Sequence, residues 1–126
     1  MINESVQYTA NIGSALISTA NSNLNGTGTV VSILTGASNG TLVKRVTVKA
    51  IVNTTHGMVR LFVYDGSSTR LLTEIDVPAV TKASVDEAFE ATVYLNFHLK
   101  SGYILKASTE KAESFQVIAE GLDWSY

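Results

Sequence analysis

The sequence predicts a single all-β domain that folds as a two-sheet antiparallel β-sandwich. Apolar and polar residues alternate with a period of two, turn signals separate the alternating segments, and about eight to ten short strands follow at regular spacing. The 126 residues fit one domain, residues 1–126, without a linker or repeat. A jelly-roll-like sandwich is the first choice, and an immunoglobulin-like sandwich is the alternative.

The N-terminal part of the chain carries strand signals separated by short turns. Asn25-Gly26 and Asn39-Gly40 mark two of these turns, because Asn and Gly tolerate a positive φ. The strands expected here are residues 7–12, 15–19 and 29–35.

The central part contains one alternating strand and one hairpin. Residues 42–52 form the strand, with one apolar side opposite a polar side of Arg45, Thr47 and Lys49. The apolar side consists of Val46, Val48, Ala50 and Val52. The β-rich segments 58–64 and 70–77 flank the turn signal Asp65-Gly66-Ser67-Ser68, so we expect them to pair as a hairpin that ends at Pro78.

The C-terminal part begins with a connecting loop and then returns to strands. Residues 80–88 form the loop, with a short helical turn at 84–88 as the alternative. Residues 88–98 alternate most regularly, so they predict a half-buried strand. Its apolar side is Phe89, Ala91, Val93, Leu95 and Phe97, and its polar side is Glu90, Thr92, Tyr94, Asn96 and His98. The last expected strands are 103–108 and 115–122.

Charge is distributed unevenly along the chain. Glu4 is the single charged residue before Lys44, although the whole chain has 9 Lys and Arg and 11 Asp and Glu residues. A water-exposed surface normally mixes both signs of charge. We therefore predict that residues 1–43 hold much of a docking or oligomer interface, with edge strands and loops of low charge as the alternative.

Composition excludes several function classes. A net charge of −2 lacks the basic face that a nucleic-acid-binding protein needs. The chain has no cysteine, so disulfides and thiolate metal sites are absent. No apolar run approaches the roughly 20 residues of a membrane span. The N-terminus shows no basic region followed by an apolar core, so no signal peptide is expected.

The residues that could carry chemistry do not form a recognised constellation. His56 is placed in a loop and His98 on the polar side of a strand, without the spacing of a metal site. The acidic pairs Glu74/Asp76 and Asp86/Glu87 lack a third oxygen-rich ligand group. Neither a Gly-x-Ser-x-Gly elbow nor a phosphate-binding loop is present. The sequence therefore predicts a non-enzyme with no catalytic residues, metal site or cofactor.

Several aromatic residues are candidates for a contact surface. Trp124 and Tyr126 flank Ser125 at the C-terminus, where the simplest interpretation is that they fasten the last strand to the body. A protein interface is the next interpretation, and a sugar-stacking platform is the third. The other candidates are Tyr8, Tyr94 and Tyr103.

Two longer segments and two short ones resemble a known group of proteins. The long ones are 57–66, followed by Thr69-Arg70-Leu71-Leu72, and 102–109, followed by 112–121. The short ones are Ser18-Thr19-Ala20-Asn21 and Gly26-Thr27-Gly28-Thr29. Together they resemble small β-sandwich virion-associated proteins of tailed bacteriophages, including those of crAss-like phages. The resemblance spans most of the chain, and its motifs are fold-forming rather than catalytic.

The resemblance implies a structural virion protein, made in the host bacterial cytoplasm. Its expected role is that of an auxiliary or decoration protein that stabilises the head lattice, with a head-fibre or tail module, or a carbohydrate-binding adhesion module, as alternatives. Its expected partners are the major capsid protein or other virion proteins. By analogy with other jelly-roll virion proteins, we also expect a homo-oligomer, namely a trimer. Neither nucleic acid nor membrane is an expected partner.

Overall fold

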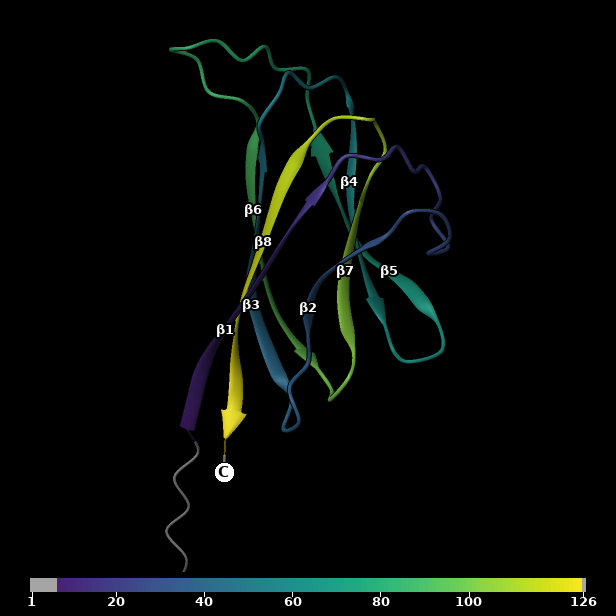
Figure 1. Ribbon diagram of the computed structural model, residues 1–126, viewed down its shortest axis with the longest axis vertical. Helices are drawn as coiled ribbons and strands as arrows, with labels where there is room; N and C mark the ends of the chain where they lie inside the picture. Colours follow the sequence, from purple (N-terminus) through teal and green to yellow (C-terminus); the bar gives the residue numbers. More distant parts are fainter. Residues whose placement is uncertain (1–6, 126) are drawn as a thin grey trace, which may run out of the picture.

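The chain folds into eight β-strands in the computed structural model, which describes residues 7–125 (Figure 1). Within these residues there is no helix long and apolar enough to cross a membrane. The strands are β1 (Gln7–Ile17), β2 (Val31–Thr35), β3 (Thr41–Ala50), β4 (Gly57–Tyr64), β5 (Thr69–Val77), β6 (Glu90–Leu99), β7 (Ile104–Thr109) and β8 (Phe115–Ser125).

The strands form two antiparallel four-stranded sheets, so the predicted two-sheet sandwich is confirmed. One sheet has the order β1-β8-β3-β6 and the other the order β2-β7-β4-β5. Every connection changes sheet except the β4–β5 hairpin, which is the strand order of a jelly-roll-like sandwich. The immunoglobulin-like alternative is wrong, because there the first two strands share a sheet, whereas β1 and β2 lie in different sheets.

The core lies between the inward faces of the two sheets. Val46 and Val48 of β3 and Val117 of β8 are fully buried from one sheet, and they meet Leu61 and Leu105 of the other. Burying each such side chain contributes about 1.5–3 kcal/mol. The period-two prediction for β6 is also confirmed, since Ala91, Val93, Leu95 and Phe97 alternate with exposed residues. These four are only partly buried because β6 is an edge strand.

Strand β3 departs from strict alternation at Lys44. Its register shifts between Val43 and Arg45 against both neighbouring strands, so Lys44 and Arg45 are both exposed. On β6, Asn96 has a positive φ of 63°, and its Oδ1 accepts a hydrogen bond of 3.1 Å from Lys44 Nζ. The expected core position of Val52 is wrong, because β3 ends at Ala50 and Val52 is 39% exposed.

Other expected boundaries also shift. The strands expected at 7–12 and 15–19 merge into one strand, β1, because the backbone stays paired with β8 through Gly13 and Ser14, and this strand ends at Ile17. The strand expected at 29–35 begins only at Val31. The alternative of a helical turn at 84–88 is wrong, because Ala83 and Asp86 exchange two backbone hydrogen bonds of 3.2 Å in a tight turn.

The predicted β4–β5 hairpin is confirmed, and Asp65 holds its turn together. Asp65 Oδ1 accepts hydrogen bonds from the backbone N–H groups of Ser68, at 2.8 Å, and Ser67, at 3.0 Å. These two bonds, the Ser68 bond first, lower the pKa of Asp65. Gly66 adopts a φ of +100°, which favours glycine.

Strand β4 is buried on both faces. Val59 and Leu61 point into the core, while Arg60 and Phe62 alternate with them on the outer face. Phe62 is nevertheless fully buried, and Arg60 is only 6% exposed. Another segment of the chain therefore covers the outer face of the β2-β7-β4-β5 sheet.

That cover is segment 18–30, which connects β1 to β2. At one point Asn21 N donates a 2.8 Å hydrogen bond to the carbonyl of Thr109, at the end of β7. At another point Gly26 lies so close to Thr69, at the start of β5, that an added Cβ would fall 2.6 Å from the Thr69 Cβ. Because β4 lies between β7 and β5, segment 18–30 passes over it.

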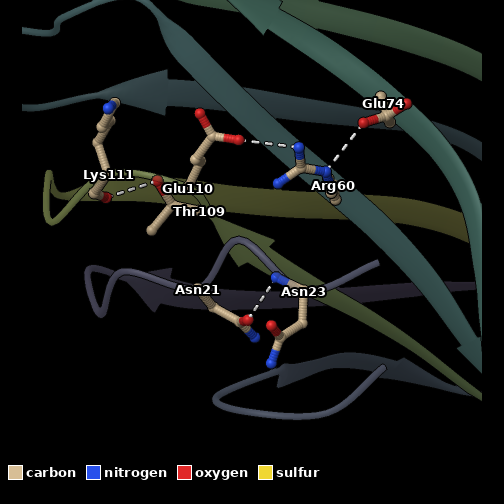
Figure 2. A network of polar contacts seen from close by, with 7 residues as sticks. All are labelled: Asn21, Asn23, Arg60, Glu74, Thr109, Glu110 and Lys111. Carbon is tan, nitrogen blue, oxygen red and sulfur yellow. Dashed lines mark hydrogen bonds and ion pairs between the residues drawn. The ribbon is translucent and has the colours of Figure 1, made fainter. Parts of the chain in front are cut away.

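Asn21 organises the covering segment. Its Nδ2 donates hydrogen bonds of 2.9 Å to the carbonyls of Thr27 and Thr29, and its Oδ1 accepts one of 3.0 Å from Asn23 N. Figure 2 shows Asn21 and Asn23 beside the end of β7. A side chain with two donors and two acceptors thus closes this uncharged loop on itself.

Arg60 ties three neighbouring parts of the same sheet together. Its Nε donates to Glu74 of β5 and its Nη2 to Glu110, just after β7, both at 2.9 Å (Figure 2). Burial opposes the positive charge, but the hydrogen bonds with Glu110 and Glu74 outweigh it and raise the pKa of Arg60. The arginine is therefore a structural cross-link rather than a free surface charge.

Replacing Arg60 with Met should lower the free energy of unfolding by about 2 kcal/mol, the range for hydrogen bonds to charged groups. The loss is moderate because Glu74 and Glu110, 41% and 29% exposed, still reach water. Urea denaturation measures this change. Arg45→Met is the matched control, because the Arg45–Glu120 pair is exposed, and it should shift the midpoint much less. Equal shifts for the two variants would contradict the cross-link.

Acid should weaken the hairpin turn through Asp65. Because its pKa is lower in the folded chain than the ordinary value of 3.8, its stabilisation is fully present above 3.8 and is lost as the pH falls from there through the lower folded-state pKa. Asp65→Asn lacks this contribution at every pH. Calorimetry should therefore show the Tm difference between the natural protein and Asp65→Asn narrowing from about pH 6 to about pH 3. A difference independent of pH would refute this role.

Candidate interaction surface

The low-charge N-terminal third occupies two different environments. Segment 18–30 covers the chain's own β2-β7-β4-β5 sheet, as described above. Strands β1 and β2 instead form edges of the two sheets. These edges meet at one side of the sandwich, where Gly13 of β1 lies against the backbone of Ile33 in β2. Segment 18–30 still exposes side chains such as Leu24, but a row of exposed apolar side chains lies on β1.

The outer face of β1 presents a row of exposed apolar side chains. Tyr8, Ile12 and Leu16 all point outward and are 54%, 63% and 49% exposed. On the adjacent strand β8, Ile118 is 39% exposed and lies opposite Ser14. We refer to Tyr8, Ile12, Leu16 and Ile118 as the apolar stripe. A group of large apolar side chains on one face is typical of an interaction site, whereas single ones are not.

The other half of the same face carries ion pairs. Arg45 of β3 pairs with Glu120 of β8 at 3.0 Å, and Lys49 of β3 pairs with Glu90 of β6 at 3.7 Å. The hydrogen bond with Glu120, followed by its negative charge, raises the pKa of Arg45. These charges satisfy one another and face water. The sheet is therefore divided into a charged half on β3 and β6 and a neutral half on β1.

The free edge of β1 adds to this neutral half. Strand β1 pairs with β8 on one side, and no other described strand is hydrogen-bonded to it. Its 11 residues contain no charge and no proline, the features that usually protect an edge from other chains. Such an edge favours coverage by a partner.

Trp124 fastens the last strand to the body, as its simplest interpretation predicted. It does so through Tyr8 on β1, a partner that the strand patterns in the sequence did not identify. Its ring lies 4.6 Å from the ring of Tyr8 on β1, and 6.3 Å from that of His98 on β6 in a stacked orientation. Tyr8 and Trp124 are register partners on the paired strands β1 and β8, so both side chains point outward. Tyr126, the other C-terminal candidate, lies outside the described residues.

The candidate chemical groups are not brought together. Glu74 binds Arg60 rather than acting with Asp76, and Asp86 belongs to the tight turn with Ala83. His56 is exposed in the loop just before β4, whereas His98 lies near the end of β6 beside Trp124. Within residues 7–125, no group of three or more His, Cys, Asp or Glu side chains could hold a metal ion.

Comparison with known proteins finds a likeness of fold. No family model matches the chain, and no curated protein matches it. A chain in the acidic stable capsid structure of Helicobacter pylori bacteriophage KHP30 is 15% identical and aligns with a TM-score of 0.57. The alignment covers 96% of this chain and 94% of that one, so the two share a fold over nearly their full lengths.

Two crystal structures of a pentameric capsid protein from metagenomic phage sequences were also found. One is 15% identical with a TM-score of 0.44, and the alignment covers 86% of this chain and 61% of that one. The other is 16% identical with a TM-score of 0.39, and the alignment covers 86% of this chain and 60% of that one.

Gly13→Ala should open the corner between β1 and β2. A Cβ at Gly13 would lie 2.0 Å from the Ile33 carbonyl oxygen, a backbone atom that no side-chain rotation can move. We expect a loss of about 2–3 kcal/mol in urea unfolding, as for other overpacked sites. Gly57→Ala is the control, because its Cβ would meet the flexible Lys111 side chain at 3.0 Å. If Gly13→Ala is no worse than Gly57→Ala, the two edges are not held together there.

Proposed function

We propose that this chain is a non-enzymatic structural protein of a bacteriophage virion, attached to the capsid as an auxiliary or decoration protein. The observation that carries the proposal is the fold shared with a chain of the phage KHP30 capsid structure over nearly the full length of both chains. The neutral apolar stripe on one sheet supports it, because an accessory protein acts by covering another surface.

The stripe is the centre of the proposed docking surface. A standard interface buries roughly 800 Å² on each partner, so the four stripe residues supply only its core. The rim would include the neighbouring uncharged polar residue Ser14, on the same face of β1. An apolar centre with a polar rim is the usual anatomy of a protein interface. This narrows the docking surface from residues 1–43 to the outer face and edge of β1 with Ile118.

The proposed mechanism is burial of surface across subunit junctions of the shell. A protein that binds only the assembled state stabilises that state by mass action. The partner is then the major capsid protein or another virion protein, and the ion-paired half of the sheet remains in water. Further copies of this chain, arranged as a trimer, are the expected neighbours on the shell.

Docking through the stripe predicts the outcome of a substitution experiment. Ile12→Lys combined with Leu16→Lys should reduce incorporation into virions of the encoding phage by at least about tenfold, because both are expected to be central contacts. Purified particles analysed by quantitative mass spectrometry give the copy number. Removing residues 1–20 is a poorer test, because it would delete β1 from its sheet.

Tyr94→Lys is the matched control, since Tyr94 is 75% exposed on the charged half of the same sheet. Its incorporation should equal that of the natural protein. Thermal unfolding of the isolated variants should show that all remain folded. Undiminished incorporation of the double variant would reject the docking role of the stripe. Imaging of labelled particles then distinguishes the head from a fibre or tail.

A further inference from the structure

An open groove lies at one end of the sandwich, apart from the centre of the apolar stripe. The β2–β3 turn and the β6–β7 turn form its walls, and the end of β8 contributes to its floor. Its volume is about 660 Å³, within the usual range for small-molecule sites. The lining residues that matter here are Ser38, Asn39, His98, Lys100, Ser101 and Trp124.

The walls of the groove are held in place by backbone hydrogen bonds. Gly36 N donates to Tyr103 O at 2.8 Å, and Gly102 N donates to Gly36 O at 3.1 Å, so the two turns are joined. Within the first turn, Ala37 N donates to Thr41 Oγ1 at 2.9 Å. A site fixed before binding loses little conformational entropy when a ligand enters.

An aromatic surface lies along one side of the groove. The indole of Trp124 is held between Tyr8 and His98, and its backbone N–H donates to Gly40 O at 3.2 Å. Gly40 has no side chain, and an added Cβ would lie 3.8 Å from Trp124 Cδ1. Glycine therefore leaves the ring edge open toward the groove. A flat amphipathic ring beside hydroxyl and amide groups matches a ligand with one apolar face and many hydroxyls.

Among the described residues that line the groove, Lys100 carries the one formal charge. Lys100 is exposed and forms no ion pair with any described residue, and no acidic residue is among the described residues that line the groove. The nearest acid in sequence, Asp123, borders the groove through the lining residue Thr41. Its Oδ1 accepts hydrogen bonds from Thr41 Oγ1 at 2.6 Å and Asn11 Nδ2 at 2.9 Å. A ligand with a carboxylate would therefore meet an unpaired cation.

We propose that this groove binds a saccharide that carries a carboxylate, such as a sialic or uronic acid. An apolar edge of the sugar would contact the open edge of Trp124, its hydroxyls would bond to Ser38, Asn39 and Ser101, and its carboxylate would accept from Lys100. A nucleic acid fits less well, because it needs a row of cations along its backbone, and the groove offers a single lysine. This activity would be additional to attachment on a capsid and does not depend on it.

The chain contains one tryptophan, so Trp124 fluorescence reports on this groove alone. Titration with the methyl glycosides of N-acetylneuraminic acid and of glucuronic acid should give a saturable change with at least one of them. Methyl glucoside, which lacks the carboxylate, should bind at least about tenfold more weakly, as expected for loss of one charge-assisted hydrogen bond. No saturable change with either acidic sugar, or equal binding of the neutral one, would overturn the proposal.

Two lysine variants test which charge is responsible. Lys100→Ala should weaken binding of the acidic sugar about tenfold, while Lys111→Ala, which removes the same charge in the β7–β8 loop, should leave it unchanged. Both residues are exposed, so neither variant should impair folding. Equal weakening by the two would indicate a general charge effect and reject the site.

Trp124→Phe, followed by proton–nitrogen NMR, should retain partial binding.

Discussion

The burial of β4 on both faces is the constraint on which the rest of this sandwich depends. In a two-sheet sandwich the outer face of each sheet usually meets water, with polar residues at alternate positions. Here Phe62 and Arg60 occupy the outer positions of β4 and are removed from water. Segment 18–30 must lie over them, so the direction in which the chain leaves β1 and enters β2 is fixed. The two edge strands consequently meet at one side.

The covering segment 18–30 contains no charged residue. Asn21, its one buried residue, is neutral and bonds its amide within the loop, which avoids the cost of burying an unpaired charge. The one charge beneath it, Arg60, is matched by Glu74 and Glu110. Ten of the 13 residues of segment 18–30 are exposed, so packing alone does not account for its lack of charge. In β1 the lack of charge coincides with a row of exposed apolar side chains, and this coincidence points to a partner.

Local patterns in the sequence were sufficient for the strands and turns whose causes are local. Alternation predicted the core face of β6, and Asp65-Gly66 predicted the hairpin turn. Features that depend on contacts between residues distant in the chain left no such pattern in the sequence. Gly13 looked like a break between two strands, whereas it is a close approach to Ile33 within one strand. The burial of Arg60 depends on segment 18–30, which lies at least 30 residues earlier in the chain, so no pattern around Arg60 indicated it.

Three segments that are distant in sequence line the groove. The sequence therefore predicted its aromatic residue, Trp124, but not the shape of the groove. Trp124 was a candidate from composition, yet Lys100 and Ser38 join it only because the jelly-roll order brings the β2–β3 and β6–β7 turns to the same end. The same order places Ile12 and Leu16 farther along β1, beyond Tyr8. A surface that covers the middle of the stripe therefore need not fill the groove. One sheet can then attach the protein through its strands and present a ligand site from its turns.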